Sequence, residues 1–182
     1  MKCKLFLVVA VFALTVSSAV AADYPMVGGQ AMYPTKNIIE NAVNSADHTT
    51  LVAAVKAAGL VDTLQGAGPF TVFAPTNEAF AKLPEGTVAT LLKHENKEVL
   101  TKVLTYHVVA GRLSADDLKK QIKAGHGKAE LTTVSGGKLW AIMKGNQIVL
   151  EDEKENFSTV TIPNVFQSNG VIHVIDAVVM PN

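Results

Sequence analysis

The hydrophobic pattern of this chain changes its period after Gly127, and this change restricts the fold more than any other feature. Before it, apolar side chains recur at helical spacing, as at Leu51, Val52 and Val55. After it, apolar and polar residues alternate, as in strands with one buried face. Helices that precede strands do not fit a regularly alternating α/β fold. We therefore predict the α+β class, with helices mainly N-terminal and strands mainly C-terminal.

Capping residues divide the first half into short helices. Gly59 is expected to end a helix that contains Leu51, Thr76 or Asn77 to cap another, and Ser114 with Asp117 to form a capping box. The predicted helices span residues 37–43, 51–58, 78–83, 87–92, 99–109 and 114–122. Phe70–Ala74 is rich in β-forming residues and is predicted to be a strand that joins the sheet of the second half.

The second half is predicted to be a series of strands separated by glycine-containing turns. The predicted strands span residues 129–134, 138–143, 147–151, 158–162 and 171–179. Pro163 should stop the fourth of these strands, because proline donates no hydrogen bond to a ladder. Residues 162–168 are therefore expected to form a connection.

The N-terminus has the features of a secretory signal peptide. Lys2 and Lys4 precede an apolar stretch from Leu5 to Val16, and Ala19-Val20-Ala21 is a pattern that signal peptidase cleaves. The stretch is too short to span a bilayer. We expect residues 1–21 to be removed, residues 22–36 to form an extended leader tied loosely to the domain, and residues 37–182 to form one domain. The mature protein would then be secreted, periplasmic or at the cell surface, without stable membrane insertion.

Composition excludes several functional classes. Cleavage removes Cys3, which is the only cysteine, so the mature domain has no disulfide. It also leaves 14 basic against 16 acidic side chains, a balance that argues against nucleic-acid binding. The five histidines show no metal-ligand spacing, and the glycine-rich turns lack a phosphate-loop lysine. The acidic run 152–155 lacks the spacing of a calcium loop and is expected to be a solvated loop. We predict neither a metal nor a cofactor.

Three segments together resemble the fasciclin domain family. Residues 68–80, GPFTVFAPTNEAF, are similar to its first signature, residues 104–109, LTYHVV, to its central tyrosine-histidine element, and residues 169–181, NGVIHVIDAVVMP, to its closing signature. The resemblance covers residues 37–181. It implies a compact β-wedge with a helical layer, found in secreted or surface proteins and associated with adhesion. The length, the single domain and the absence of cysteine from the mature chain suggest a bacterial member.

The polar residues of these motifs have two interpretations. Thr76, Asn77, His173 and Asp176 are expected to be structural, with partners inside the fold, because polar groups on apolar faces need hydrogen bonds. Tyr106 and His107 are candidate binding residues, and core positions are the alternative. His107 is surrounded in sequence by Leu104, Val108 and Val109, which favours the core.

Catalysis has little support in the sequence. Ser168, His173 and Asp176 contain the residue types of a hydrolase triad, but no Gly-x-Ser-x-Gly elbow is present. His173 and Asp176 would also face opposite sides of an extended strand. We predict a non-catalytic module that contacts an extracellular protein or polysaccharide. A secreted enzyme with a hidden site and an envelope protein without a specific ligand are the alternatives.

The candidate binding edge is the segment of residues 162–168. Asn164, Val165 and Phe166 belong to it, and an exposed aromatic residue in a connection often marks a contact; an inward-facing Phe166 is the alternative. Animal members linked to integrin binding carry an acidic residue where this chain has Asn164. The resemblance therefore argues against integrin recognition here. No feature of the sequence indicates an oligomer, and a monomer is expected.

Overall fold

The computed structural model describes residues 24–182, so the predicted signal peptide lies outside the described part of the chain. The helical elements are α1 (Ile38–Ala42), η1 (Ala46–His48), α2 (Thr49–Ala58), α3 (Val61–Gln65), α4 (Asn77–Ala81), α5 (Thr87–Leu91), η2 (His94–Asn96), α6 (Lys97–Tyr106) and α7 (Ala115–Ala124). The strands are β1 (Met26–Val27), β2 (Gln30–Ala31), β3 (Phe70–Pro75), β4 (Val108–Ala110), β5 (Lys128–Thr132), β6 (Lys138–Lys144), β7 (Gln147–Glu151), β8 (Phe157–Gln167) and β9 (Gly170–Ile175).

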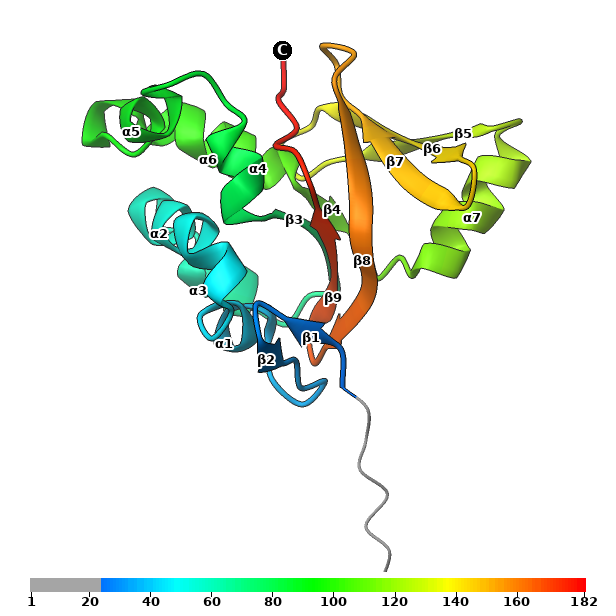
Figure 1. The fold of residues 1–182 in the computed structure, drawn as a ribbon, viewed down its shortest axis with the longest axis horizontal. Coiled ribbons are helices and arrows are strands. Elements are labelled where there is room, and N and C mark those ends of the chain that lie inside the picture. Colours follow the sequence, from blue (N-terminus) through cyan, green and yellow to red (C-terminus); the bar gives the residue numbers. More distant parts are fainter. Residues whose placement is uncertain (1–23) are drawn as a thin grey trace, which may run out of the picture.

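Strands from both halves of the chain form one seven-stranded sheet within the described residues. Its order is β4-β3-β9-β8-β7-β6-β5, and β3 runs parallel to β9 while the other neighbours are antiparallel. Helices α1–α6 gather on one side of the long strands β8 and β9, and α7 lies beneath the arm formed by β5–β7 (Figure 1). The predicted α+β class is confirmed, and the Phe70 strand joins the C-terminal strands as expected.

Several helix ends follow the local signals. Asn37 forms a capping box with Glu40 at the start of α1, and Ser114 forms one with Asp117 at the start of α7. Gly59 ends α2 with a φ of 74°, a left-handed conformation that glycine adopts without a steric penalty. Short-range chemistry thus determines where these helices begin and end.

Tertiary pairing explains two wrong boundaries; the strand predicted over residues 171–179 is also too long, because β9 ends at Ile175. The helix expected to continue to Val109 ends at Tyr106, because Val108 and Val109 pair with β3 instead. Strand β8 continues through Pro163 to Gln167. The register of β8 against β9 shifts between Ile162 and Val165, and proline is tolerated at such irregularities because a ladder bond is already missing there.

Part of the expected leader is integrated into the domain. Met26–Val27 and Gln30–Ala31 pair as a small hairpin, and Val27 and Met32 are buried in the core. The prediction of a loosely tied segment is therefore wrong for residues 26–32. Strands of two residues are too short to show an alternating pattern in the sequence.

The interior contains two clusters of buried apolar side chains. The helical core lies between helices α1–α4 and α6 and strands β3 and β9; its members include Ile38, Leu51, Ala54, Val55, Leu64, Val72, Leu100, Val103, Leu104, Val165, Ile172 and Val174. The strand core lies between α7 and the sheet; its members include Phe73, Tyr106, Leu118, Ile122, Leu131, Leu139, Ala141, Ile148, Leu150, Val160 and Ile175. None of the helices described is both long enough and apolar enough to cross a bilayer.

Candidate functional site

Thr76 and Asn77 fix the corner between β3 and α4. The Thr76 hydroxyl accepts a hydrogen bond from the Ala79 N–H at 3.2 Å and caps α4. The Asn77 side chain reaches the start of another helix, where Oδ1 accepts from the Thr50 N–H at 3.0 Å and Nδ2 donates to the Ala46 carbonyl at 2.8 Å. Asn77 therefore supplies an N-terminal cap to α2 from a distant part of the chain.

Tyr106 lies entirely inside the protein and joins two loops of the strand arm. Its side chain is buried, and its hydroxyl donates to the Lys138 carbonyl at 2.5 Å and accepts from the Glu153 N–H at 3.2 Å. Burial raises the pKa of the Tyr106 phenol to about 12. The hydroxyl stays protonated and structural at physiological pH, so the expectation of a surface contact by Tyr106 is corrected.

His107 is also buried, and both of its ring nitrogens have partners. Nδ1 lies 2.8 Å from the Val103 carbonyl and donates to it, while Nε2 accepts from the Val179 N–H at 3.2 Å. Burial lowers the pKa of His107 to about 4. The ring is a neutral link between α6 and the C-terminal segment, and the core alternative replaces the expected binding contact.

His173 occupies the centre of β9 with a similar arrangement. Nε2 donates to the Leu113 carbonyl at 2.8 Å, and Nδ1 accepts from the Asn164 N–H at 3.3 Å. The ring stacks on Phe73, with centroids 5.7 Å apart. Burial lowers the pKa of His173, which favours the neutral ring that these two bonds require.

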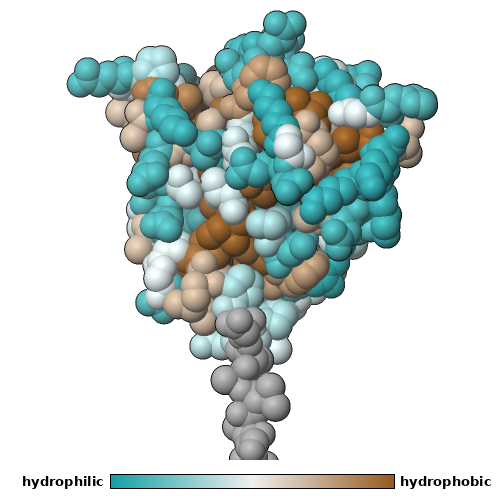
Figure 2. All heavy atoms as spheres, turned by 45° about the vertical axis from the view of Figure 1, so that its right-hand side comes forward, coloured by the Kyte–Doolittle hydropathy of each residue, from teal (hydrophilic) through white to brown (hydrophobic). Residues whose placement is uncertain are grey.

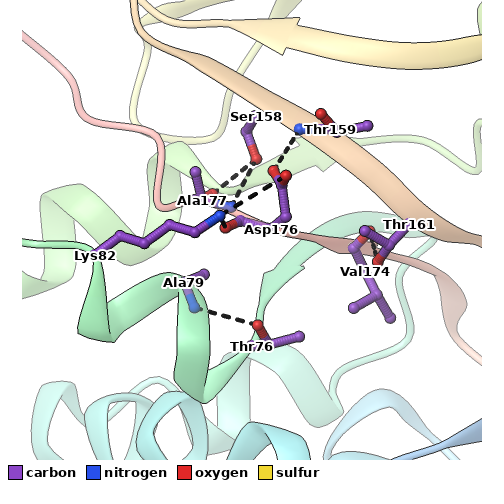
Figure 3. Close-up of polar contacts among 9 residues, drawn as sticks. All are labelled: Thr76, Ala79, Lys82, Ser158, Thr159, Thr161, Val174, Asp176 and Ala177. Carbon is purple, nitrogen blue, oxygen red and sulfur yellow. Dashed lines mark hydrogen bonds and ion pairs between the residues drawn. The ribbon is translucent and has the colours of Figure 1, made fainter.

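Asp176 joins the end of β9 to β8 and to the end of α4 (Figure 3). Its Oδ1 accepts from the Thr159 N–H at 2.7 Å. The Lys82 ammonium donates to the Asp176 backbone carbonyl at 2.6 Å and lies 3.8 Å from Oδ2. Next to it, the Ser158 hydroxyl donates to the Ala177 carbonyl at 2.8 Å. Asp176 therefore has the structural role that its position in the motif predicts: it links α4, β8 and β9.

The residue types of a hydrolase triad are not joined in this structure. Both ring nitrogens of His173 are bonded to other groups, and the Asp176 carboxylate faces Thr159 and Lys82. Ser168 donates its backbone N–H to the Lys36 carbonyl. A triad needs direct serine–histidine and histidine–carboxylate bonds, and neither exists among these residues.

The second half of β8 has a neighbouring strand on one side only, although β8 lies in the middle of the sheet. β8 pairs with β7 only at residues 157–159, whereas its pairing with β9 extends from Val160 to Gln167. Asn164, with a φ of 60°, turns its Oδ1 toward the first residue of α7 and accepts from the Ala115 N–H at 2.7 Å. Val165 then points inward and is 1% exposed. The expectation that Val165 is a contact residue is therefore corrected.

Phe166 is the part of this edge that reaches the surface. Its side chain is 39% exposed, and the Arg112 guanidinium lies 5.2 Å from the ring centroid. Arg112 Nη2 also donates to the Gln167 carbonyl at 3.1 Å, which holds the cation over the ring. Phe166 does not fold inward as a plug. Sequence reasoning missed Arg112, because nothing nearby in the chain links it to Phe166.

Other aromatic rings also have a cation close by. Lys128 lies 4.7 Å from the centroid of Trp140, and Lys144 lies 3.8 Å from that of Phe157, which is 49% exposed. On the side that carries β5–β7, hydrophobic areas are visible between long hydrophilic side chains (Figure 2). Phe166 differs from these residues because its strand segment lacks a neighbour on one side.

Two structural residues escaped the sequence analysis. Asp152 is buried, although it belongs to a run expected to be a solvated loop; its carboxylate accepts from the N–H groups of Lys154, Asn156 and Met180 at 2.9 Å each. Asn169 accepts from the Ile38 N–H and donates to the carbonyls of Leu64 and Gly66; these contacts tie the β8–β9 turn to the helices. An isolated polar residue in a turn gives no signal of such distant partners.

A sequence profile of the Fasciclin domain matches residues 46–181. The chain belongs to the fasciclin domain family. Its fold also matches the FAS1 domain pair from the insect cell adhesion molecule Fasciclin I, with a TM-score of 0.70 and 19% identity. That match covers 78% of this chain and 50% of the solved chain, so the protein spans about half of the domain pair.

Bacterial and mammalian proteins are similar in sequence. Protein sll1483 of Synechocystis is 49% identical over 144 residues, which cover 79% of this chain and 73% of that protein. Immunogenic protein MPB70 of Mycobacterium bovis is 36% identical over 145 residues, which cover 77% of this chain and 66% of the relative. The transforming growth factor-beta-induced protein ig-h3 of Sus scrofa is 36% identical over 131 residues, which cover 72% of this chain and 17% of that longer protein.

Proposed function

We propose that this protein is a secreted or cell-surface contact module that binds an extracellular protein or polysaccharide through the outer edge of β8, without catalysing a reaction. The observation that carries the proposal is the exposed Phe166 under the Arg112 guanidinium, on a strand segment that lacks a neighbour in the described sheet. A solved structure with this fold comes from a cell adhesion molecule, which supports the same class of function.

The anchoring of this edge favours specific binding. Val165 is buried in the helical core, so the next residue, Phe166, is held outward on a rigid backbone. Arg112 is fixed by its bond to the Gln167 carbonyl. A partner that contacts this edge meets a prearranged aromatic and cationic pair, and therefore loses little conformational entropy there. Aromatic and arginine side chains contribute strongly to many interfaces.

The arrangement of the motif residues supports a role without catalysis. Tyr106, His107 and His173 are buried and have hydrogen-bond partners, and burial favours the uncharged forms of all three. A general acid or base must reach the proton that it transfers. The Tyr106 hydroxyl and all four ring nitrogens of the two histidines are already engaged in internal hydrogen bonds, so these groups act as internal links.

The test compares two phenylalanines on one strand. Phe166→Ser should weaken binding of residues 22–182 to envelope fractions of the producing cells by about tenfold, because an interface anchor is lost. Its unfolding midpoint should change little, since the side chain is partly exposed. Phe157→Ser is the matched control: it removes another exposed ring with a cation from β8, and binding should be unchanged. Equal binding by all three proteins would overturn the β8 edge as the contact surface.

The two alternative functions predict different results. A hydrolase would turn over ester, peptide or glycoside substrates, and the activity would fall in a His173→Gln variant that still folds. An envelope protein without a ligand would bind the fractions weakly and without saturation. The proposed module shows saturable binding and no turnover.

A further inference from the structure

An apolar cavity lies between the helical layer and the sheet, on the inner side of β8, where Val165 contributes to its lining. The centre of a water-sized sphere can move through a volume of about 70 Å³ inside this cavity. One water needs about 10–15 Å³ by that measure, so the cavity has room for a larger molecule. The lining side chains come from the hairpin, the helices and the sheet, and include Val27, Met32, Leu51, Val55, Val72 and Ile172.

His48 is a polar group in this apolar lining. Its side chain is 3% exposed, and Nδ1 lies 2.8 Å from the Ser45 hydroxyl. Nε2 has no hydrogen-bond partner within residues 24–182. The Ala74 backbone lies close enough to His48 to act against the lowering of its pKa, but no contact of Nε2 has the geometry of a hydrogen bond. An unpaired buried nitrogen costs about 1–3 kcal/mol, so a partner here would be stabilising.

Water is a poor partner at this position. A buried water normally makes two to four hydrogen bonds, and Nε2 is the unpaired side-chain atom that the described lining offers. A hydrocarbon group fits the rest of the surface, since apolar cavities of moderate size bind small apolar molecules. The occupant that satisfies both parts has an apolar body and one polar end.

The polar end should be uncharged. Burial lowers the pKa of His48, so the ring is neutral near pH 7 and offers no countercharge. Lys56 is the one charged residue of the lining and is exposed on α2, so a carboxylate or phosphate at buried His48 Nε2 would lose its hydration without compensation. A hydroxyl can donate or accept, and it therefore fits either tautomer of the ring.

We infer that the cavity is a binding site for a small uncharged alcohol, whose hydrocarbon part fills the apolar lining and whose hydroxyl bonds to His48 Nε2. Half-buried residues at the corner of α2 and α3, Val52, Leu60 and Val61, also line the cavity and bring it close to the surface there. Neither the site nor the ligand class depends on the β8 edge or on the proposed adhesion role.

Benzyl alcohol and ethylbenzene test the inference, because they differ by one hydroxyl in place of a methyl group. NMR titration of residues 22–182 with either compound should shift the signals of Leu51, Val55, Val72 and Ile172. The ratio of the two dissociation constants reports the hydroxyl bond. In His48→Phe this ratio should move about fivefold toward ethylbenzene, since one hydrogen bond is lost. In His94→Phe, which replaces an exposed histidine outside the lining, the ratio should stay within about twofold of the original.

Core variants separate cavity binding from effects on folding. Val55→Ile and Val72→Ile each add one methylene to the lining and should weaken both compounds severalfold. Val160→Ile adds the same group to the strand core and should leave binding unchanged. If neither compound shifts the lining signals, or if Val160→Ile weakens binding as much as Val55→Ile, the cavity is not the site. An unchanged ratio in His48→Phe overturns the assignment of an alcohol.

Discussion

The helical core and the strand core are built from similar apolar side chains, yet they are closed to different degrees. In the strand core, Leu118, Leu139, Ala141 and Leu150 are all 0% exposed, under the single ten-residue helix α7. In the helical core, several helices of only five residues meet the sheet, and most of the cavity lining belongs to this side. One amphipathic helix on a continuous sheet can interdigitate along its whole length, whereas the helical core combines two ten-residue helices, α2 and α6, with short helices, and the joints between them can leave gaps.

Equivalent leucine deletions in the two cores should expose this difference most strongly. Leu150→Ala should lower the free energy of unfolding by about 4 kcal/mol, because a fully enclosed side chain leaves a cavity. Leu51→Ala should cost about 2.5 kcal/mol, since Leu51 already borders empty space and has fewer contacts to lose. Urea denaturation of both variants measures the two losses. Equal losses would mean that the helical core is packed as tightly as the strand core.

Acid should act through the buried histidines, two of which, His48 and His107, line the cavity. The pKa of His107 falls to about 4 in the folded protein, against about 6.5 unfolded. The unfolded chain therefore binds more protons as pH falls below 6.5. Stability should be complete above that pH and decline by up to about 3 kcal/mol as pH approaches 4. His48 and His173, whose pKa values are also lowered by burial, act in the same direction.

Urea titrations at pH 7.5, 6.0, 5.0 and 4.5 measure this decline. The carboxyls of Asp117 and Glu153 have pKa values lowered by hydrogen bonds, and their loss of stability begins only at lower pH. A free energy of unfolding that stays constant from pH 7.5 to 4.5 would contradict neutral, buried histidines.

Two histidine variants compare a satisfied ring with an unsatisfied one. His107→Ala should cost about 2 kcal/mol, because it leaves the Val179 N–H without its acceptor and opens a space. His48→Ala should cost about 1 kcal/mol, since His48 gives up one bond, to Ser45, and Nε2 is unpaired from the start. Thermal melts and urea midpoints rank the two. A greater loss in His48→Ala would show that its ring is better satisfied than the geometry indicates.

The difference between local and long-range contacts explains how far the sequence could predict this structure. Local chemistry predicted the caps at Gly59 and Ser114, because their partners lie within four residues. The fate of Tyr106–Val109 depends on β3, about thirty-five residues earlier, so a helical pattern could not show that the helix stops at Tyr106. The hydrophobic periodicity also predicted the fold class, because this pattern extends over many residues.

The sequence singled out the residues of the candidate site, but it could not show which way their side chains point. Residues 164–166 were expected in a connection but lie in β8, and only the structure shows that Val165 faces the core and Phe166 the solvent. A bulge changes which side of a strand each residue faces, and the sequence does not reveal a bulge. Arg112 and His48 acquire their significance through spatial neighbours alone.

The smallest expected effect concerns the ion pair that joins the two sides of the molecule. Lys82, at the end of α4, lies 3.8 Å from the Asp176 carboxylate, which also accepts from Thr159 in β8. The two side chains are 58% and 39% exposed, so solvent screens their attraction.

Lys82→Ala should therefore cost about 0.5 kcal/mol, and less in high salt. Lys93→Ala, which removes another exposed ion pair within one local segment, is the matched control and should cost even less. In a double-mutant cycle, Lys82→Ala and Asp176→Ala should show a coupling of about 0.5 kcal/mol, because the loss of the Asp176–Thr159 bond occurs with and without Lys82 and cancels. A coupling above about 1.5 kcal/mol would mean that this contact, rather than the shared sheet, holds the two sides together.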